Sequence, residues 1–209
     1  MNDSKPPGSD FVDIVGTSVY QKGWGFNDAT PATFVSDSIR IIYNEYALLY
    51  NKPFVISECS GGWESGSGVS PVTGAFIASV TSSVDQATFQ ADFWSEVLSS
   101  SLLASYPLLQ GAYIFEVVKQ EEFYSDFRVS NDSAVRAAFL NVVNQFDATG
   151  NMVWANAVST TTTTTTTIST TIEALTTISS TADVSSQNSS SLKTSYFIIL
   201  GFTISALLF

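Results

Sequence analysis

Pro53-Phe-Val-Ile-Ser57 is the second of three short apolar runs that decide the fold. The first is Phe11-Val-Asp-Ile-Val-Gly-Thr17 and the third is Gly111-Ala-Tyr-Ile-Phe115. Short runs of β-branched and aromatic residues, bounded by Gly, Pro or polar residues, are typical of buried strands. We therefore predict a strand at each of the three positions.

A stretch with helical spacing of apolar residues follows each run, over residues 34–50, 86–104 and 132–146. Crossovers of this length allow the strands to pair in parallel, which predicts an α/β sheet with helices outside. An eight-stranded (β/α)8 TIM barrel typically takes about 250 residues, so roughly 150 residues supply less than its circumference. We expect residues 1–155 to form a partial barrel.

The composition excludes several classes of function. The chain has 209 residues, a formal net charge of −11 and no His. It lacks the clustered Lys and Arg that bind a phosphate backbone, so we expect no nucleic-acid partner. Without His, Ser/His/Asp catalysis and most zinc sites are excluded within this chain, and nothing in it indicates a metal or a cofactor. A carboxylate is the expected acid or base.

The aromatic residues fall almost entirely before residue 155, and residues 156–191 are chiefly Ser and Thr. Such a segment has too little apolar surface to offset its chain entropy, so we expect a disordered stalk. In exported proteins a stalk of this composition carries O-linked sugars.

Residues 192–209 end in an apolar run that continues to the last residue. Small residues, a short polar spacer and a terminal apolar tail predict a glycosylphosphatidylinositol attachment signal, with Asn188 or Ser189 as the attachment residue. A membrane-spanning tail helix is the alternative, although the run is shorter than the roughly 20 residues such a helix needs. Asn131 and Asn188 each begin an N-glycosylation triplet, consistent with an extracellular, membrane-anchored protein.

Anchoring of this kind requires export, yet residues 1–10 contain no apolar stretch resembling a signal peptide. We therefore expect the natural amino terminus to lie upstream of Met1, which agrees with the incomplete barrel.

Glu58 follows the second apolar run directly, at the expected carboxyl end of a strand. Active sites of barrel enzymes lie at this edge of the sheet. A carboxylate there can attack a sugar carbon and form a glycosyl-enzyme intermediate if a second carboxylic acid protonates the leaving oxygen. The alternative is a structural carboxylate in a solvated loop.

Several stretches together resemble the last three βα units of fungal glycoside hydrolase family 26-like proteins, whose known members are mainly β-mannanases. The resemblance covers residues 10–145 and rests on the three apolar runs and on Lys52-Pro-Phe-Val-Ile-Ser-Glu58. It rests further on Phe93-Trp94 ahead of Tyr106-Pro107, on Gly111 to Glu121, and on Asp126-Phe-Arg-Val-Ser-Asn-Asp-Ser133.

The resemblance implies that Glu58 is the nucleophile and that Tyr20, Trp24 and Phe115 line the sugar subsites. Trp63, in the loop after Glu58, is a further candidate for sugar contact. The family's acid/base Glu belongs to an earlier strand, which this sequence does not contain. Cys59 stands where the family has Thr or a small residue, so the choice of polysaccharide stays open.

Two other functions fit the same residues. Glu58-Cys-Ser-Gly-Gly-Trp63 also resembles the nucleophile loop of family 17-like β-1,3-glucanases. A noncatalytic surface protein that binds carbohydrate through an aromatic surface is the other alternative. Whatever the function, Trp24, Trp63 and Phe115 could instead simply pack the mouth of the barrel.

Overall fold

The computed structural model of the chain describes residues 9–152 and 198–200. The expected Ser/Thr stalk at 156–191 lies outside these residues, as do the candidate attachment residues Asn188 and Ser189. The expected anchor segment at 192–209 lies outside them too, apart from 198–200.

Three parallel strands form the centre of a mixed sheet: β1 (Val15–Lys22), β3 (Phe54–Ser65) and β7 (Leu109–Ile114). They lie side by side in chain order, with β3 in the middle. β8 (Val118–Gln120) and β9 (Tyr124–Asp126) form a hairpin whose second strand pairs antiparallel with the end of β3. β10 (Ile198–Leu200) pairs in parallel with β7. The sheet is not closed, because β3 is the one described strand that pairs with β1.

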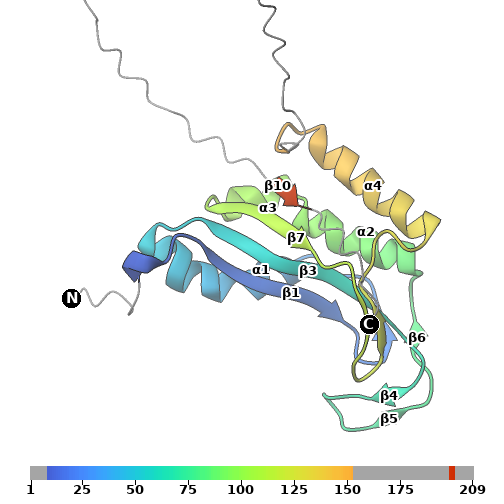
Figure 1. Ribbon diagram of the computed structural model, residues 1–209. Helices are drawn as coiled ribbons and strands as arrows, with labels where there is room; N and C mark the ends of the chain where they lie inside the picture. Colours follow the sequence, from blue (N-terminus) through green and yellow to red (C-terminus); the bar gives the residue numbers. More distant parts are fainter. Residues whose placement is uncertain (1–8, 153–197, 201–209) are drawn as a thin grey trace, which may run out of the picture. The chain divides into compact units, whose positions relative to one another are not determined.

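A helix follows each of the three central strands, as the spacing of apolar residues predicts. α1 (Phe34–Ile42) continues without a break into the π-helical segment η2 (Tyr43–Leu48). α2 (Gln86–Val97) and α3 (Ser100–Ser105) follow β3, and α4 (Ser133–Asp147) follows the β8–β9 hairpin. The helices gather on one side of the strands (Figure 1).

The core fills the layer between these helices and the sheet. One face of each central strand points into it, although register shifts interrupt the alternation in β3 and β7, and the helices meet these side chains with aromatic and branched residues. Core members from the strands are Val19, Phe54, Ile56, Cys59, Leu109 and Ala112; those from the helices include Val35, Ile39, Tyr43, Phe93, Trp94, Val97, Phe139, Val142 and Val143. The opposite face of the sheet carries no helix and is open over the first half of the strands.

The predicted first strand is displaced along the chain. We expected it at residues 11–17, but β1 begins at Val15, and Phe11 belongs to the short 3-10 turn η1 (Ser9–Phe11) with its side chain 90% exposed. Val15 pairs with Phe54, the first residue of β3. Residues 11–14 therefore lie outside the β1–β3 ladder, and no other described strand pairs with them.

The predicted helix at 86–104 is in fact two helices. Leu98 leaves the helical conformation with φ −97° and ψ 62°, and Ser99 begins α3 by accepting a hydrogen bond from the Leu102 amide at 3.1 Å. A serine side chain can replace an intrahelical bond in this way, which ends one helix and starts the next.

Short ladders complete the domain and were not expected. β2 (Phe26–Asn27) pairs with β6 (Thr81–Ser82), and β4 (Gly68–Val69) pairs with β5 (Phe76–Ile77). They lie beyond the carboxyl ends of β1 and β3 and build the surroundings of the site described next.

Candidate functional site

A β-bulge in the middle of β3 determines where Glu58 points. Thr17 of β1 pairs with Ile56, but the next residue, Ser18, pairs with Glu58, so β3 contains one extra residue. The register against β7 shifts at the same place. Ser57 and Glu58 are both exposed, whereas Ile56 and Cys59 on either side are fully buried. The bulge thus turns Glu58 to the helix-free face and returns Cys59 to the core.

Tyr20 lies beside Glu58 on β1. Its hydroxyl donates a hydrogen bond to Glu58 Oε2. Burial raises the pKa of the Tyr20 phenol well above its usual range, and the hydrogen bond and negative charge of Glu58 raise it further. The phenol therefore stays protonated and remains a donor to one oxygen of the carboxylate.

Three aromatic rings pack edge to face next to this pair. The ring centroids of Tyr20 and Phe115 lie 5.2 Å apart, those of Tyr20 and Phe127 5.5 Å, and those of Phe115 and Phe127 5.3 Å. Phe115 and Tyr20 are partly exposed, whereas Phe127 is 1% exposed and forms the base of the trio. The family resemblance implied roles for Tyr20 and Phe115 but not for Phe127.

Phe127 is held in place by its backbone and by the shape of β3. Its carbonyl accepts a hydrogen bond from the Ser60 hydroxyl at 2.5 Å, and its amide donates to the Val117 carbonyl at 3.0 Å. Its ring lies over Gly62, where a Cβ atom would come within 2.6 Å of the ring carbon Cε1. Ser60 and Gly62, one polar and one small residue at alternate positions of β3, leave space on this face of the strand. This pattern was the one feature of the sequence that could have indicated an aromatic ring packed over β3.

Two lysines lie over the rings. Lys119 Nζ is 5.2 Å from the centroid of Phe115, and Lys22 Nζ is 4.9 Å from the centroid of Trp24. Glu121, at the turn of the β8–β9 hairpin, forms ion pairs with both lysines, at 2.7 Å from Lys119 Nζ. Burial lowers the pKa of Lys22 below its ordinary value. The site is therefore an aromatic surface whose positive lysine charges are paired with the negative charge of Glu121, so it carries charges of both signs.

Trp24 extends this surface from the turn after β1. Lys22 links it to the trio, because Lys22 Nζ also lies 5.8 Å from the Phe127 centroid. Tyr20, Glu58, Phe115 and Trp24 thus belong to one connected group of side chains.

The structure does not bring Trp63 into this group. Its ring packs edge to face against Phe89 of α2, with centroids 5.6 Å apart, on the helix side of β3. Residues 62 and 64 flank it and point to the opposite face, as the alternation along a strand requires.

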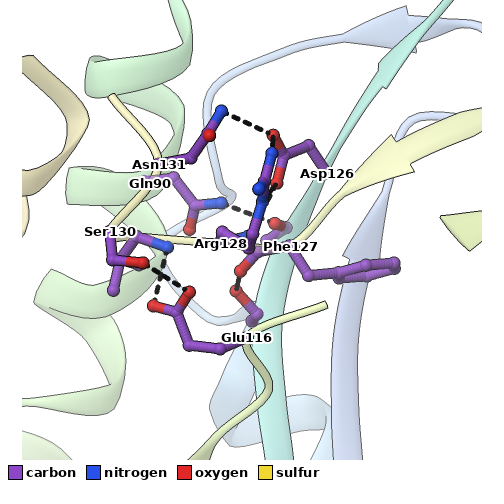
Figure 2. Close-up of polar contacts among 10 residues, drawn as sticks. Gln90, Glu116, Asp126, Phe127, Arg128, Ser130 and Asn131 are labelled. Carbon is purple, nitrogen blue, oxygen red and sulfur yellow. Dashed lines mark hydrogen bonds and ion pairs between the residues drawn. The ribbon is translucent and has the colours of Figure 1, made fainter. Parts of the chain in front are cut away.

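A polar network fixes the segment that carries Phe127 (Figure 2). The Asp126 carboxylate accepts two hydrogen bonds from the Arg128 guanidinium, each at 2.9 Å, and one from the Asn131 amide at 3.2 Å. The Glu116 carboxylate accepts the amide of Val129 at 3.0 Å and the Ser130 hydroxyl at 3.1 Å. These carboxylates stabilise the loop between β9 and α4. Asn131, a predicted glycosylation residue, is exposed.

Cys59 is fully buried in the core. Its Sγ lies 3.5 Å from the Tyr113 carbonyl, and burial raises the pKa of the thiol. A thiol in this state is a poor nucleophile.

Within residues 9–152, no group of three or more His, Cys, Asp or Glu side chains is arranged to hold a metal ion. Among the described helices, none combines the length and apolarity needed to cross a membrane. Comparison of this chain with protein-family models and with curated proteins finds no match.

Proposed function

We propose that this domain is the carboxyl-terminal part of a retaining glycoside hydrolase acting on a β-linked polysaccharide, with Glu58 as the nucleophile. The observation that carries the proposal is the hydrogen bond from Tyr20 to Glu58 Oε2 on the exposed, helix-free face of the sheet. The hydroxyl holds one oxygen and fixes the plane of the carboxylate. The other oxygen is left for attack on an anomeric carbon.

The arrangement of strands supports a barrel origin for this site. β1, β3 and β7 are parallel, adjacent in chain order and covered by helices on one side (Figure 1). Consecutive units of a (β/α)8 barrel have this order, and their chemistry lies toward the carboxyl ends of the strands. We propose that the domain corresponds to the last three βα units of such a barrel.

The proposed reaction also needs a proton donor. In a retaining enzyme the two carboxyl groups lie about 5–5.5 Å apart. Glu64 follows Glu58 by six positions on β3, and at about 3.3 Å per residue the two backbones are roughly 20 Å apart. Glu116 and Glu121 are bound to the Val129 amide and to the two lysines. We propose that the acid belongs to the earlier barrel strand that the resemblance implies.

Tyr20, Phe115 and Trp24 supply the apolar surface that sugar rings need. Partly exposed aromatic rings offer flat faces for stacking, and the neighbouring Lys22 and Lys119 offer hydrogen-bond donors to hydroxyl groups. The hydrogen bond between Tyr20 and Glu58 supports the proposal that sugar binding and nucleophilic attack occur on the same face of the sheet.

The test is reducing-sugar release from mannan, laminarin and other β-glycans by the full-length protein. We expect release by the wild type, its loss in Glu58→Gln, and normal release in Glu45→Gln, which changes an exposed carboxylate on η2. Activity of Glu58→Gln equal to the wild type would refute the role of Glu58. Cleavage of laminarin without cleavage of mannan would favour the family 17-like β-1,3-glucanase instead.

A second candidate is a noncatalytic carbohydrate-binding surface. It is favoured by the fact that no described carboxylate lies at catalytic distance from Glu58 along β3, whereas Tyr20, Phe115 and Trp24 offer partly exposed rings. Glycan binding without turnover, unchanged in Glu58→Gln, would support this candidate.

We also propose that the protein is anchored at the outer cell surface through its carboxyl-terminal segment. The support is the small-residue site at Asn188 or Ser189 followed by the apolar tail. Phosphatidylinositol-specific phospholipase C should release the protein from intact cells. Retention after this treatment would favour the membrane-spanning alternative.

A further inference from the structure

Glu64 is a buried carboxylate that the proposed reaction does not use. Its side chain lies near the end of β3, on the same face as Glu58, and the residue is 2% exposed. A charge removed from water in this way needs partners to offset its desolvation. The positions of those partners indicate what Glu64 does.

The partners of Glu64 belong to the turn that carries Trp24. Glu64 Oε2 accepts a hydrogen bond from the Gly25 amide at 2.6 Å. The Asn27 side chain also makes two hydrogen bonds to the backbone of Glu64. Asn27 Oδ1 accepts from the Glu64 amide, and Asn27 Nδ2 donates to the Glu64 carbonyl, both at 2.9 Å. The end of β3 therefore holds the turn between β1 and β2 from two sides.

The turn needs such support because its backbone is strained. Trp24 has φ +54° and Gly25 has φ +103°, so two successive residues lie in the left-handed region. Glycine adopts this region freely, but a bulky residue such as Trp does so at a cost of about 1–3 kcal/mol. Glycine at 25 also leaves room for neighbours, since a Cβ atom there would come within 2.3 Å of Ile77 Cδ1.

Trp24 occupies the outer end of the aromatic surface, where Lys22 Nζ lies 4.9 Å from its ring centroid. We propose that Glu64 is a positioning residue: its buried carboxylate, through the Gly25 amide, keeps Trp24 in the strained turn that presents the indole ring to a sugar. The inference rests on the proposed glycan-binding role of Trp24. In this proposal Glu64 takes no direct part in the reaction assigned to Glu58.

Two substitutions separate this role from a general structural one. Glu64→Gln loses the charge but keeps an oxygen that can accept from Gly25. Glu64→Asp keeps the charge but is one methylene too short to make that bond without moving the turn. If Glu64 positions Trp24 through its hydrogen bond to Gly25, Glu64→Gln should keep the wild-type exposure of Trp24 and Glu64→Asp should not. Glu45→Asp, at an exposed residue of η2, is the matched control.

The first readout is acrylamide quenching of Trp24 fluorescence in the full chain, obtained by subtracting the signal of the corresponding Trp24→Phe variant. We expect stronger quenching in Glu64→Asp and unchanged quenching in Glu64→Gln and Glu45→Asp. Far-UV circular dichroism verifies that each variant is folded. Quenching in Glu64→Asp equal to the wild type would overturn the proposal, and so would equal increases in the Asp and Gln variants.

The second readout is binding of mannohexaose or laminarihexaose, titrated on the same signal. Glu64→Asp should weaken binding about tenfold, which corresponds to about 1.4 kcal/mol, with Glu64→Gln close to the wild type. Unchanged affinity in Glu64→Asp, despite stronger quenching, would refute the link between the turn and the sugar. If the wild type binds no glycan, the proposed function fails, and the quenching comparison still decides whether Glu64 holds Trp24.

Discussion

Replacing Gly62 by Ala tests the packing on which the aromatic trio depends. A Cβ atom at this position would lie 2.6 Å from Cε1, 2.9 Å from Cζ and 3.3 Å from Cδ1 of Phe127. Phe127 has little freedom to withdraw, because it is 1% exposed and its ring contacts both Tyr20 and Phe115. The new methyl group must therefore displace the ring or the strand.

The expected magnitude is the difference between two effects. An interior strand position normally favours Ala over Gly by about 0.5–1 kcal/mol, and the backbone of Gly62 has no positive φ that would prevent this gain. Inserting a methyl group into a filled core costs about 1–3 kcal/mol. We expect Gly62→Ala to lower the free energy of unfolding by about 0.5–2 kcal/mol.

The control is the same substitution in a Phe127→Leu background. Leucine lacks Cε1 and Cζ, the two ring atoms that the methyl group would meet first. Gly62→Ala should then become neutral or stabilising, so the two substitutions should be clearly non-additive. Urea unfolding followed by far-UV circular dichroism measures all four proteins. Equal destabilisation by Gly62→Ala in both backgrounds would show that the ring is not the cause, and the reasoning would fail.

Three further predictions follow from single side chains. In a spectrophotometric titration of the native protein, Tyr20 should stay protonated while ordinary tyrosines ionise near pH 10, and Glu58→Gln should lower its pKa. Burial raises the pKa of Glu64 in the folded state above its unfolded value of about 4.3. Glu64 therefore adds to the free energy of unfolding below that pH, and this contribution is lost as the pH rises through the folded pKa. Urea unfolding at pH 4 and pH 7 should show this loss in the wild type and not in Glu64→Gln. The Asp132 carboxylate caps α4 by accepting from the amide of Ala134 at 2.7 Å, so Asp132→Ala should cost about 1 kcal/mol of unfolding free energy and Asp132→Asn much less.

The sequence alone predicts the three strand–helix cycles and the α/β class, and the structure confirms them. These features depend on local periodicity and on crossover length, both of which are visible in one chain. The predicted start of β1 was wrong because the first residue of a strand depends on where its partner strand begins. Phe11 to Ile14 have strand-like composition, yet pairing begins only where Val15 meets Phe54.

The packing face of the first helix was only partly predictable. An α-helical wheel places Tyr46 and Leu49 toward the core, but both are exposed, and Ala47 is buried instead. The buried residues Val35, Ile39, Tyr43 and Ala47 recur at intervals of four, which in an α-helix of 3.6 residues per turn would drift by about 40° at each step. The π-helical segment η2 reverses part of this drift because its turns are wider. No local composition signalled that change.

In the candidate site, the sequence predicted residues on the central strands better than residues on the hairpin. Glu58 follows from its place at the end of an apolar run, and Tyr20 from the family resemblance. Phe127 lies beyond a hairpin that pairs antiparallel with β3, and its contact with Tyr20 spans a long sequence separation. Short strands rich in charged residues, such as Val118–Gln120, lack the apolar alternation on which strand prediction depends.

The bulge in β3 explains why a carboxylate can follow a buried strand at this point without entering the core. With regular alternation from Ile56, Ser57 would face the open side and Glu58 would face the helices, where Cys59 and its neighbours are fully buried. An ionised Glu in that layer would lose its hydration and find no cation among the core residues there. The extra residue at Ser57 removes this conflict, because Glu58 stays on the open side beside Tyr20 and the apolar alternation resumes at Cys59. The two adjacent polar residues between Ile56 and Cys59 are therefore the mark, in the sequence itself, of the irregularity that creates the candidate site.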